Sequence, residues 1–541
     1  MMSSSNTSRM PANTRRYPKV FIAIGATITV AIGLLLAVVA PANAAPPAGK
    51  TIVSLTFDDG HASQQVAFDT MKQYGMLGTY FMNSGFIGST GFFTLDQVKA
   101  IAAYGNEIGS HTISHPDLTT LSADEASRQI CGDRVNWATW GIPTSNFAYP
   151  FASSTTAVET LVKNCGNNSG RGLGDIKTRF SCPTCAVSET IPPVDPYFTK
   201  APDQVDTTWT LADLKQSVTQ AEATGGWVQL TFHDLCDGCA SPNLSPAIFQ
   251  QFVAWLAPRA SRGTVVETVG QVIGGASAPA VPGPVAPEAA PGVNAIKNPS
   301  METFDAATGL PQCFVPGGYG SNTPTWAVST DAHTGASAVQ LTMANYVDGD
   351  AKLATALDLG ECAPTVTAGK TYALSEWYKS TVPTQFDVYY RTSLGTWTYW
   401  TSSPWFVASA TYAQANFVTP AIPAGATAVS FGLNLFSNGT LTTDDMSMID
   451  NSAPAPVALR SLAQSNLSLT PSAAVAVGDT PSLGDAPKVK GDDVTEHYVV
   501  PDPIPAGVVP DQNQQVVVPD VQNPSATPDT TFVISPELIR G

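Results

Sequence analysis

The sequence predicts an α/β barrel followed by an all-β domain, and three observations carry this prediction. Short apolar segments alternate with amphipathic helical segments up to about residue 274, which is the order expected of a parallel barrel. A segment of mostly Ala, Pro, Gly and Val follows over 275–293, and it has too few large apolar residues to fold. Over 294–452 the helical period disappears and strand-like segments recur between Gly, Pro and Asn turns, which is typical of a β-sandwich.

Short apolar segments between the helical segments are the expected barrel strands. They are 51–57, 78–83, 107–110, 146–149, 227–232 and 264–266. Because the carboxyl ends of parallel strands meet at one rim of a barrel, side chains that end these strands are expected to lie close together. The region 45–274 is long enough to bury a single core.

Two aspartates and two histidines stand where such strands end. Asp58 and Asp59 close the first strand, and His111 and His115 follow the segment 107–110. Their spacing of four puts both imidazoles on one face if a helix begins there. Two imidazoles and one carboxylate suit Zn²⁺, Co²⁺ or Fe²⁺ and leave positions open for water and substrate. The alternative is a helix N-cap at either aspartate and two surface histidines.

The segments Thr56-Phe57-Asp58-Asp59-Gly60 and His111-Thr112-Ile113-Ser114-His115 resemble the first two signature motifs of the NodB-type polysaccharide deacetylases. This is the carbohydrate esterase family 4 group, which includes chitin and peptidoglycan deacetylases. The resemblance implies that family's distorted (β/α) barrel over 45–274. It also implies that Asp58 is the general base, that Asp59, His111 and His115 are metal ligands, and that the ion is Zn²⁺, with Co²⁺ or Fe²⁺ as alternatives.

The segment 147–151, Phe-Ala-Tyr-Pro-Phe, is similar to the third motif of the family. Many members have an arginine at the position of Ala148, where it orients the base, so Asp58 needs another partner here. Arg171 is the candidate, since a guanidinium holds a carboxylate through two parallel hydrogen bonds; the alternative is an ordinary surface arginine. The resemblance places Tyr149, Pro150 and Phe151 at the pocket, with the Phe151 N–H on the developing oxyanion.

The segment 227–233 ends in Leu230-Thr231-Phe232-His233, which resembles the fifth motif. His233 is then the general acid, because imidazole donates a proton near neutral pH, and Leu230 lines a pocket for the acetyl methyl. The alternative is a histidine that caps a backbone carbonyl. Asp206 is the candidate for the aspartate that tunes this histidine. Helix capping is the alternative there, since Thr210 begins a near-capping box.

These roles imply hydrolysis of an acetamide to acetate and a free amine. The expected substrate is a polymer that contains N-acetylglucosamine, either chitin-like or cell-wall glycan. An O-acetyl esterase acting on acetylated xylan is one alternative, because the same site cleaves an ester, whose leaving group is easier. A secreted glycan-binding protein without catalysis is the other.

The domain at 294–452 resembles jelly-roll carbohydrate-binding modules through Asn298-Pro299-Ser300-Met301-Glu302, His333-Thr334-Gly335 and Thr443-Asp444-Asp445-Met446. Related modules hold a structural Ca²⁺ at the places of Glu302 and Asp445. Trp397, Trp400 and Trp405 lie close together in the sequence and are candidates for a sugar platform. The alternative is a sandwich core that contains two or three of these aromatic rings.

The N-terminal segment 1–44 is a predicted signal peptide. It has four positive charges, an apolar run over 20–40 and the small residues Ala42-Asn43-Ala44; an uncleaved membrane anchor is the alternative. Its removal changes the formal net charge from −17 to −21, which disfavours nucleic acid and anionic lipid and leaves neutral polysaccharide as the partner. The expectation is a secreted monomer, in association with the cell wall if the tail is a stalk.

Eight cysteines in an exported chain predict disulfides. Cys131 with Cys165 and Cys313 with Cys362 are the expected long-range pairs. The Cys-x-x-Cys segments 182–185 and 236–239 have the spacing of a four-thiolate zinc site, but export favours disulfides there as well.

The C-terminal segment 453–541 repeats Pro-Asp every nine residues between 501 and 529 and has few aromatic residues. Such a composition does not form a packed core. We expect a disordered, extended spacer or a wall-associated stalk.

Overall fold

The computed structural model describes residues 50–239 and 242–451. The predicted signal peptide and the repeated tail therefore lie outside the described residues. Within the described ranges, no helix is both long enough and apolar enough to cross a membrane.

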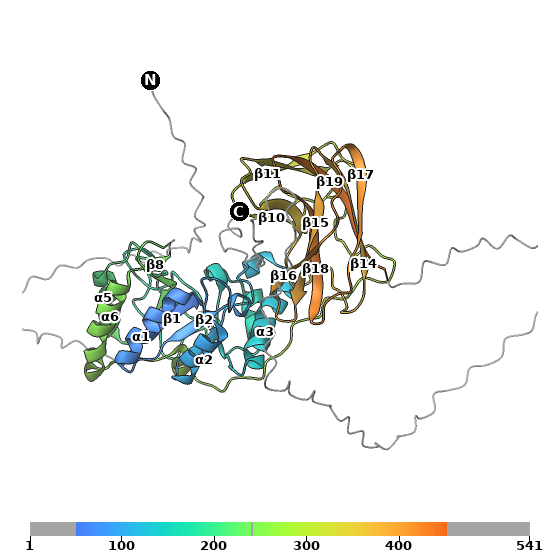
Figure 1. Cartoon of the computed structure of the whole chain (residues 1–541). Helices are drawn as coiled ribbons and strands as arrows, with labels where there is room; N and C mark the ends of the chain where they lie inside the picture. The colour runs from blue at the N-terminus through green and yellow to red at the C-terminus, as the bar shows by residue number, and fades with distance from the viewer. Residues whose placement is uncertain (1–49, 240–241, 452–541) are drawn as a thin grey trace, which may run out of the picture. The chain divides into compact units, whose positions relative to one another are not determined.

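The first part of the chain is built on a parallel sheet whose longest strand is β1 (Thr51–Asp59). The strand order is β5-β4-β3-β2-β1-β6. The strands around β1 are β2 (Thr79–Met82), β3 (Glu107–Ser110), β4 (Asn146–Ala148), β5 (Ser169–Arg171), β6 (Gly226–Phe232) and β9 (Thr264–Val266), which pairs with the start of β1. The predicted α/β barrel is thus confirmed as a parallel half-barrel (Figure 1).

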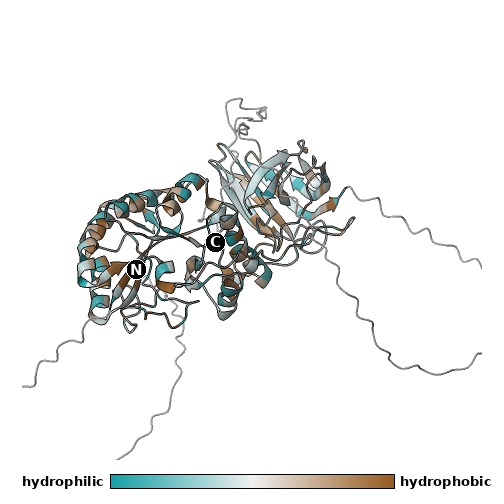
Figure 2. Ribbon diagram, turned by 90° about the horizontal axis from the view of Figure 1, so that it is seen from below, coloured by the Kyte–Doolittle hydropathy of each residue, from teal (hydrophilic) through white to brown (hydrophobic). Residues whose placement is uncertain are grey.

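Helices follow the strands and form an outer arc around the sheet (Figure 2). They are α1 (Gln65–Gln73), α2 (Leu95–Ala103), α3 (Ala123–Thr139), α4 (Thr156–Asn164), α5 (Leu211–Thr224), α6 (Pro246–Leu256) and α7 (Val269–Ile273). Side-chain caps define several helix starts, because they satisfy backbone N–H groups of the first turn. Thr210 and Asp213 form the predicted capping box of α5.

The core between the sheet and its helices fixes the relative positions of the strand ends. The Phe57 ring lies 4.6 Å from that of Tyr80 on β2 and 5.6 Å from that of Phe232 on β6. Phe249 on α6 packs edge-on against Phe57, at 5.9 Å. All four rings are fully buried, and burial of one such side chain contributes about 1.5–3 kcal/mol. These contacts fasten β1 to both neighbouring strands one residue before Asp58.

The second part of the chain contains two antiparallel sheets of five strands each, so the predicted β-rich domain is confirmed. One sheet has the order β10-β13-β18-β15-β16 and the other β11-β12-β19-β14-β17. The strands are β10 (Phe314–Tyr319), β11 (Thr323–Ser329), β12 (Ala338–Ala344), β13 (Asp350–Thr355), β14 (Tyr372–Ser380), β15 (Gln385–Thr392), β16 (Trp397–Ser402), β17 (Ser409–Val418), β18 (Ala426–Leu435) and β19 (Gly439–Asp450). One apolar cluster takes side chains from both sheets.

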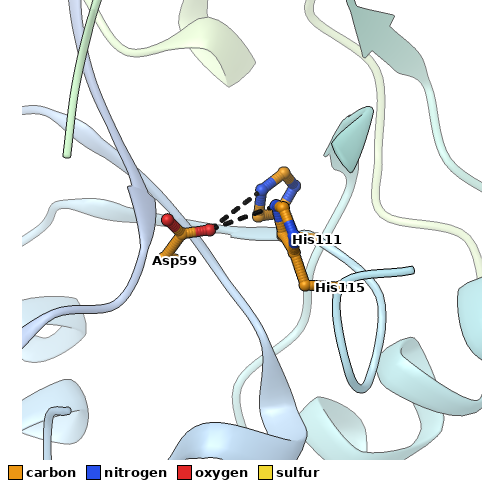
Figure 3. Close-up of side chains that lie close together, drawn as sticks. All are labelled: Asp59, His111 and His115. Carbon is orange, nitrogen blue, oxygen red and sulfur yellow. Dashed lines mark ion pairs between the residues drawn. The ribbon is translucent and has the colours of Figure 1, made fainter. Parts of the chain in front are cut away.

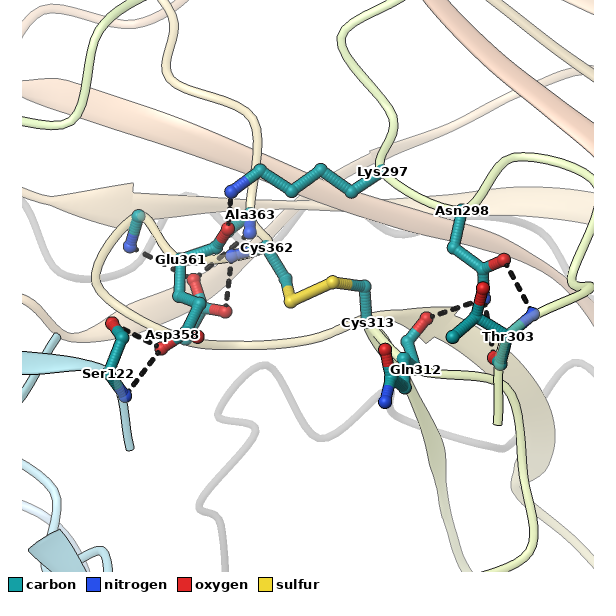
Figure 4. Close-up of a disulfide and its surroundings, with 11 residues drawn as sticks. Ser122, Lys297, Asn298, Thr303, Gln312, Cys313, Asp358, Glu361, Cys362 and Ala363 are labelled. Atoms are coloured by element: carbon teal, nitrogen blue, oxygen red, sulfur yellow. Dashed lines mark hydrogen bonds between the residues drawn. A yellow bond between two sulfur atoms is a disulfide. The ribbon is translucent and has the colours of Figure 1, made fainter. Parts of the chain in front are cut away.

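All eight cysteines form disulfides. The predicted pairs Cys131–Cys165 and Cys313–Cys362 are both present. Figure 4 shows the second pair, beside which the Asp358 carboxylate accepts hydrogen bonds from the N–H groups of Cys362 and Ala363. The segments 182–185 and 236–239 each close their own disulfide, so the alternative of a four-thiolate zinc site is wrong.

A buried carboxyl group lies between the two antiparallel sheets. Glu376 on β14 is fully buried, and its Oε2 accepts a hydrogen bond of 3.2 Å from the N–H of Leu433 on β18. Its Oε1 has no hydrogen-bond partner among the described residues. Burial raises the pKa of Glu376 to about 8, since the charged form is poorly solvated there.

Glu376 therefore makes the stability of this domain fall as pH rises. In the unfolded chain the group loses its proton near its ordinary pKa, whereas in the folded chain it keeps the proton up to about pH 8. We expect the unfolding temperature to decrease from pH 5 to pH 8. Glu376→Gln should remove this decrease and stabilise the domain at pH 8 by roughly 3–4 kcal/mol.

Calorimetry at both pH values measures the effect. Glu361→Gln, which changes a glutamate that is not fully buried, is the control. An unchanged pH slope in Glu376→Gln would contradict the assignment.

Candidate metal centre

Three side chains converge at the carboxyl end of the parallel sheet. Asp59 is the last residue of β1, His111 follows β3 directly, and His115 lies in the loop after it. The Asp59 Oδ1 is 3.4 Å from Nε2 of His111 and 3.3 Å from Nε2 of His115 (Figure 3). The three ligand atoms lie within 4.8 Å of one another.

This arrangement fits a divalent metal ion. Two ligands at about 2.0–2.1 Å from a tetrahedral ion stand about 3.3 Å apart, close to both separations at Asp59. The Oδ1 atom is buried and accepts no hydrogen bond within the described chain. An orphaned carboxylate oxygen between two imidazole nitrogens is what a cation would satisfy. Asp59, His111 and His115 thus form a divalent metal site with open coordination positions.

The pKa values of the three ligands shift in different directions. For His111, burial alone lowers the pKa, but Asp59 and Asp58 outweigh that effect and raise it. Burial lowers the pKa of His115 to about 4, so its ring is neutral. Burial alone raises the pKa of Asp59, but His115, His111 and His61 outweigh that effect and hold it well below its usual value. The Nδ1 of His111 lies 2.8 Å from the carbonyl oxygen of Ala148. A proton on Nδ1 donates there and leaves the Nε2 lone pair for the metal.

The predicted helix at 111–115 is wrong, because this segment is an irregular loop. Thr112 and His115 have φ values of 71° and 59°, which no α-helix contains. The Oγ1 of Thr112 accepts a hydrogen bond of 2.9 Å from the His115 N–H, and the side chain of Asn83 donates to the His111 carbonyl. These local bonds bring the two rings to 4.8 Å without a helical turn.

Asp133 on α3 supports the metal site and was not a predicted site residue. Its carboxylate accepts hydrogen bonds from the N–H groups of Ser84 and His111, from the Ser110 hydroxyl and from the Trp137 indole. Burial raises the pKa of Asp133 to about 6. The available signal was an acidic residue on the apolar face of a helix that also carries Trp137.

Asp58 lies beside the metal site and is only 2% exposed. Its Oδ2 forms an ion pair with Nη2 of Arg171, whereas its Oδ1 has no hydrogen-bond partner among the described residues. Arg171 is buried and also donates to Oγ1 of Thr231 at 2.9 Å. It ends β5 in register with Ala148 on β4. Asp58 therefore receives its guanidinium from β5, the neighbour of β4, where the third motif has Ala148 in place of the arginine.

His233 follows β6 at the same end of the sheet. Its Nδ1 is buried without a partner in the described chain, and burial lowers its pKa. Its carbonyl accepts a hydrogen bond of 3.1 Å from Nε2 of Gln64, which also donates to the Asp58 carbonyl. Gln64, not a predicted site residue, therefore ties β1 to β6. The Asp206 carboxylate accepts from the N–H and hydroxyl of Thr208, so its tuning role stays a prediction.

The predicted pocket residues occupy different environments. Phe151 is 46% exposed, has a φ of 56°, and its ring lies 4.6 Å from that of His115. Pro150 is buried and begins the short 3₁₀ turn that contains Phe151. Tyr149 is buried and donates its hydroxyl to the Tyr197 carbonyl. Leu230 is fully buried in the main core. The pocket role of these four residues stays a prediction.

The predicted calcium ligands, Glu302 before β10 and Asp445 on β19, both contact one loop of the second domain. Glu302 Oε1 accepts from the N–H groups of Ala336 and Ser337 at 2.8 and 3.0 Å. Asp445 accepts from the Thr334 hydroxyl and contacts Nδ1 of His333. Both carboxylates thus bind the segment 333–337, and a calcium ion there remains a prediction.

The three candidate platform tryptophans differ in exposure. Trp397 is 8% exposed and belongs to a small apolar cluster. Trp400 is partly buried against the main core of the domain. Trp405 is 51% exposed and lies edge-on to Phe436 at 5.5 Å. Only Trp405 of the three offers most of its surface to a ligand.

Comparison with known proteins shows which family the first domain is similar to. Residues 45–170 match the family model of the polysaccharide deacetylases. The peptidoglycan-N-acetylmuramic acid deacetylase PdaA of Bacillus subtilis is 37% identical over 92 residues, which are 16% of this chain and 31% of that protein. A peptidoglycan-N-acetylglucosamine deacetylase of Bacillus cereus is 37% identical over 86 residues, which are 16% of this chain and 30% of that protein. The chain thus spans about a third of the length of these curated relatives.

Among solved structures, the family 4 acetyl xylan esterase of Clostridium thermocellum in complex with a cobalt ion is similar. It has 18% sequence identity and a TM-score of 0.30, and the match covers 41% of this chain and 90% of that one. The match over residues 45–170, which include Asp59, His111 and His115, relates this part of the chain to the polysaccharide deacetylases.

Proposed function

We propose that this protein is an exported, metal-dependent deacetylase that removes acetyl groups from a glycan containing N-acetylglucosamine, chitin-like or peptidoglycan. One observation carries the proposal: Asp58 presents a free Oδ1 beside the metal triad while Arg171 holds its other oxygen. A carboxylate in this state can accept a proton but cannot turn away from the site. The deacetylases named among the relatives act on peptidoglycan, which supports this substrate class.

The residues divide the reaction between them. Asp59, His111 and His115 would hold a divalent ion, most suitably Zn²⁺, which would supply polarisation of the acetyl carbonyl and a lowered pKa of water. Asp58 takes a proton from the attacking water through Oδ1, and Arg171 keeps that carboxylate oriented. The Phe151 N–H donates to the developing oxyanion. His233 gives a proton to the leaving nitrogen, because an amine leaves poorly unless it is protonated.

Location outside the cytoplasm is supported by the four disulfides, since such bonds persist in oxidising compartments. The N-terminal signal peptide is proposed from the sequence and lies outside the described residues. The second domain is proposed to hold the enzyme on its polymer through an aromatic surface that includes Trp405, which is half exposed.

Deacetylation of O-acetyl groups, as on acetylated xylan, is the second candidate. The observation that favours it is the unpartnered Nδ1 of His233, because no carboxylate of the described residues accepts a hydrogen bond from this nitrogen and so supports a protonated ring for an amine leaving group. An ester needs less assistance, since its alcohol leaves more easily than an amine.

Neighbouring carboxylates provide the first test. Asp58→Asn should lower kcat for acetate release from chitooligosaccharides by about 10²–10⁴-fold while stoichiometric zinc is retained. Asp59→Asn should lose both zinc and activity, because it removes a ligand. Elemental analysis and an acetate assay measure the two effects. Full activity of Asp58→Asn, or of chelator-treated enzyme, would refute the proposal.

Arg171 provides the second test. Arg171 donates to Asp58 through Nη2 alone and to Thr231 through Nη1, so the two parallel bonds to the carboxylate expected from the sequence are not present. Arg171→Lys keeps the positive charge but loses the planar group that makes both contacts at once, so we expect kcat to fall about tenfold or more while zinc affinity stays unchanged. Arg179→Lys is the matched control, since this arginine pairs with Asp213 and is half exposed. If Arg171→Lys turns over at the wild-type rate, the orienting role is wrong.

His233 separates the two substrate classes. His233→Ala should lower amide deacetylation by about 10²-fold or more and ester deacetylation by less. The assay compares chitooligosaccharides, peptidoglycan and acetylxylan at equal acetyl concentration. Wild-type activity on acetylxylan alone would favour the second candidate, and an unaffected amide rate in His233→Ala would remove its role as the acid.

A further inference from the structure

His61 lies next to the metal triad and has no role in the reaction described above. It follows the turn at Asp59 and Gly60, and its side chain is 21% exposed. Its Nε2 is 3.4 Å from Oδ2 of Asp59. The other oxygen of the same carboxylate, Oδ1, faces the two triad histidines. The two oxygens of Asp59 therefore have different partners.

The second ring nitrogen of His61 faces the segment after β6. Its Nδ1 is 3.8 Å from Oδ2 of Asp234, the residue that follows His233. Oδ1 of Asp234 accepts a hydrogen bond of 2.6 Å from the Ser63 hydroxyl, which in turn accepts one of 3.1 Å from the Leu235 N–H. A continuous set of polar contacts therefore runs from the metal-binding carboxylate to the segment that carries His233.

The His61 ring has little freedom to leave this position. It stacks on the Phe92 ring with centroids 5.0 Å apart and an interplanar angle of 21°. Backbone hydrogen bonds hold the loop on both sides, from Ala62 N–H to the Gly91 carbonyl at 2.8 Å and from Phe93 N–H to the Gly60 carbonyl at 3.0 Å. A ring fixed in this way can fix the carboxylate that it contacts.

We infer that His61 is a positioning residue that engages Oδ2 of Asp59, so that Oδ1 alone faces the metal, and that Asp234 acts through His61. The inference rests on the proposed function, since it concerns the same metal site. His61 is not a ligand, because its Nε2 lies at the oxygen turned away from His111 and His115. Removal of such an outer partner of a metal ligand typically weakens metal binding by about 10–100-fold.

Zinc titration of the metal-stripped full-length protein, against a competing chromophoric chelator, tests this role. His61→Ala should raise the Kd for Zn²⁺ by about 10–100-fold. His61→Gln should stay within about threefold of wild type, because its amide can donate to Oδ2 from a similar place. His333→Ala is the matched control, since it removes a histidine of the second domain, and its Kd should equal that of wild type.

Two further measurements distinguish positioning from general structural damage. The unfolding temperature of metal-free His61→Ala should match that of metal-free wild type. The visible spectrum of the Co²⁺-loaded protein should change in His61→Ala and return in His61→Gln, because the spectrum reports ligand geometry. Asp234→Asn should weaken zinc binding less than His61→Ala, and the double variant no more than His61→Ala alone.

A wild-type Kd and an unchanged cobalt spectrum in His61→Ala would overturn the inference. An equal loss of zinc affinity in His61→Gln and His61→Ala would also overturn it. That result would mean that only an imidazole serves at this position, as expected of a direct ligand. Failure of the wild-type protein to bind zinc at all is a separate outcome, which refutes the proposed function itself.

Discussion

Two adjacent aspartates at the end of one buried strand each need a positively charged or polar partner of their own, and the arrangement of the site follows from this constraint. Asp58 is almost fully buried and Asp59 nearly so, and a buried carboxylate without a partner is strongly destabilising. The chain turns at Asp59, where φ is 71°, so the two side chains reach different neighbours. Asp58 meets a guanidinium, whereas Asp59 meets imidazoles with an open position between them. The different partners separate the proposed base, Asp58, from the metal ligand, Asp59, although the two residues are adjacent.

The parallel sheet makes this division possible. Carboxyl ends of parallel strands meet at one edge, so β1, β3, β5 and β6 each deliver a polar group to the same place. The Arg171 guanidinium shows that a neighbouring strand can supply the partner of Asp58. Ala148 and Arg171 are paired across β4 and β5, and an arginine on either strand starts from the same level of the sheet. In this chain the positive charge at Oδ2 of Asp58 comes from the end of β5.

A second layer of polar groups holds the first in place. The Asp133 carboxylate accepts a hydrogen bond from the His111 N–H, and the Ala148 carbonyl accepts one from the His111 ring. The Gln64 side chain donates to the backbone carbonyls of Asp58 and His233. Each satisfies a buried donor or acceptor that would otherwise be costly, and by doing so it limits the movement of a metal ligand, of the proposed base or of the proposed acid. This is how a half-barrel that does not close keeps its rim ordered.

The sequence by itself determined the layers, the strand ends that carry the chemistry and the long-range disulfide pairs. Continuous apolar strands and their terminal Asp and His residues are local features, so periodicity and spacing reveal them. Only the tertiary structure decided how His111 and His115 converge, since a loop with left-handed residues replaces the expected helical turn. The sequence offered Arg171 as a candidate partner of Asp58, with a surface arginine as the alternative, and the tertiary structure shows the ion pair. It also shows Asp206 bound to its own turn. The physical reason is that partners of a buried charge are chosen across the sheet, at separations of more than a hundred residues, where no local pattern in the chain records the contact.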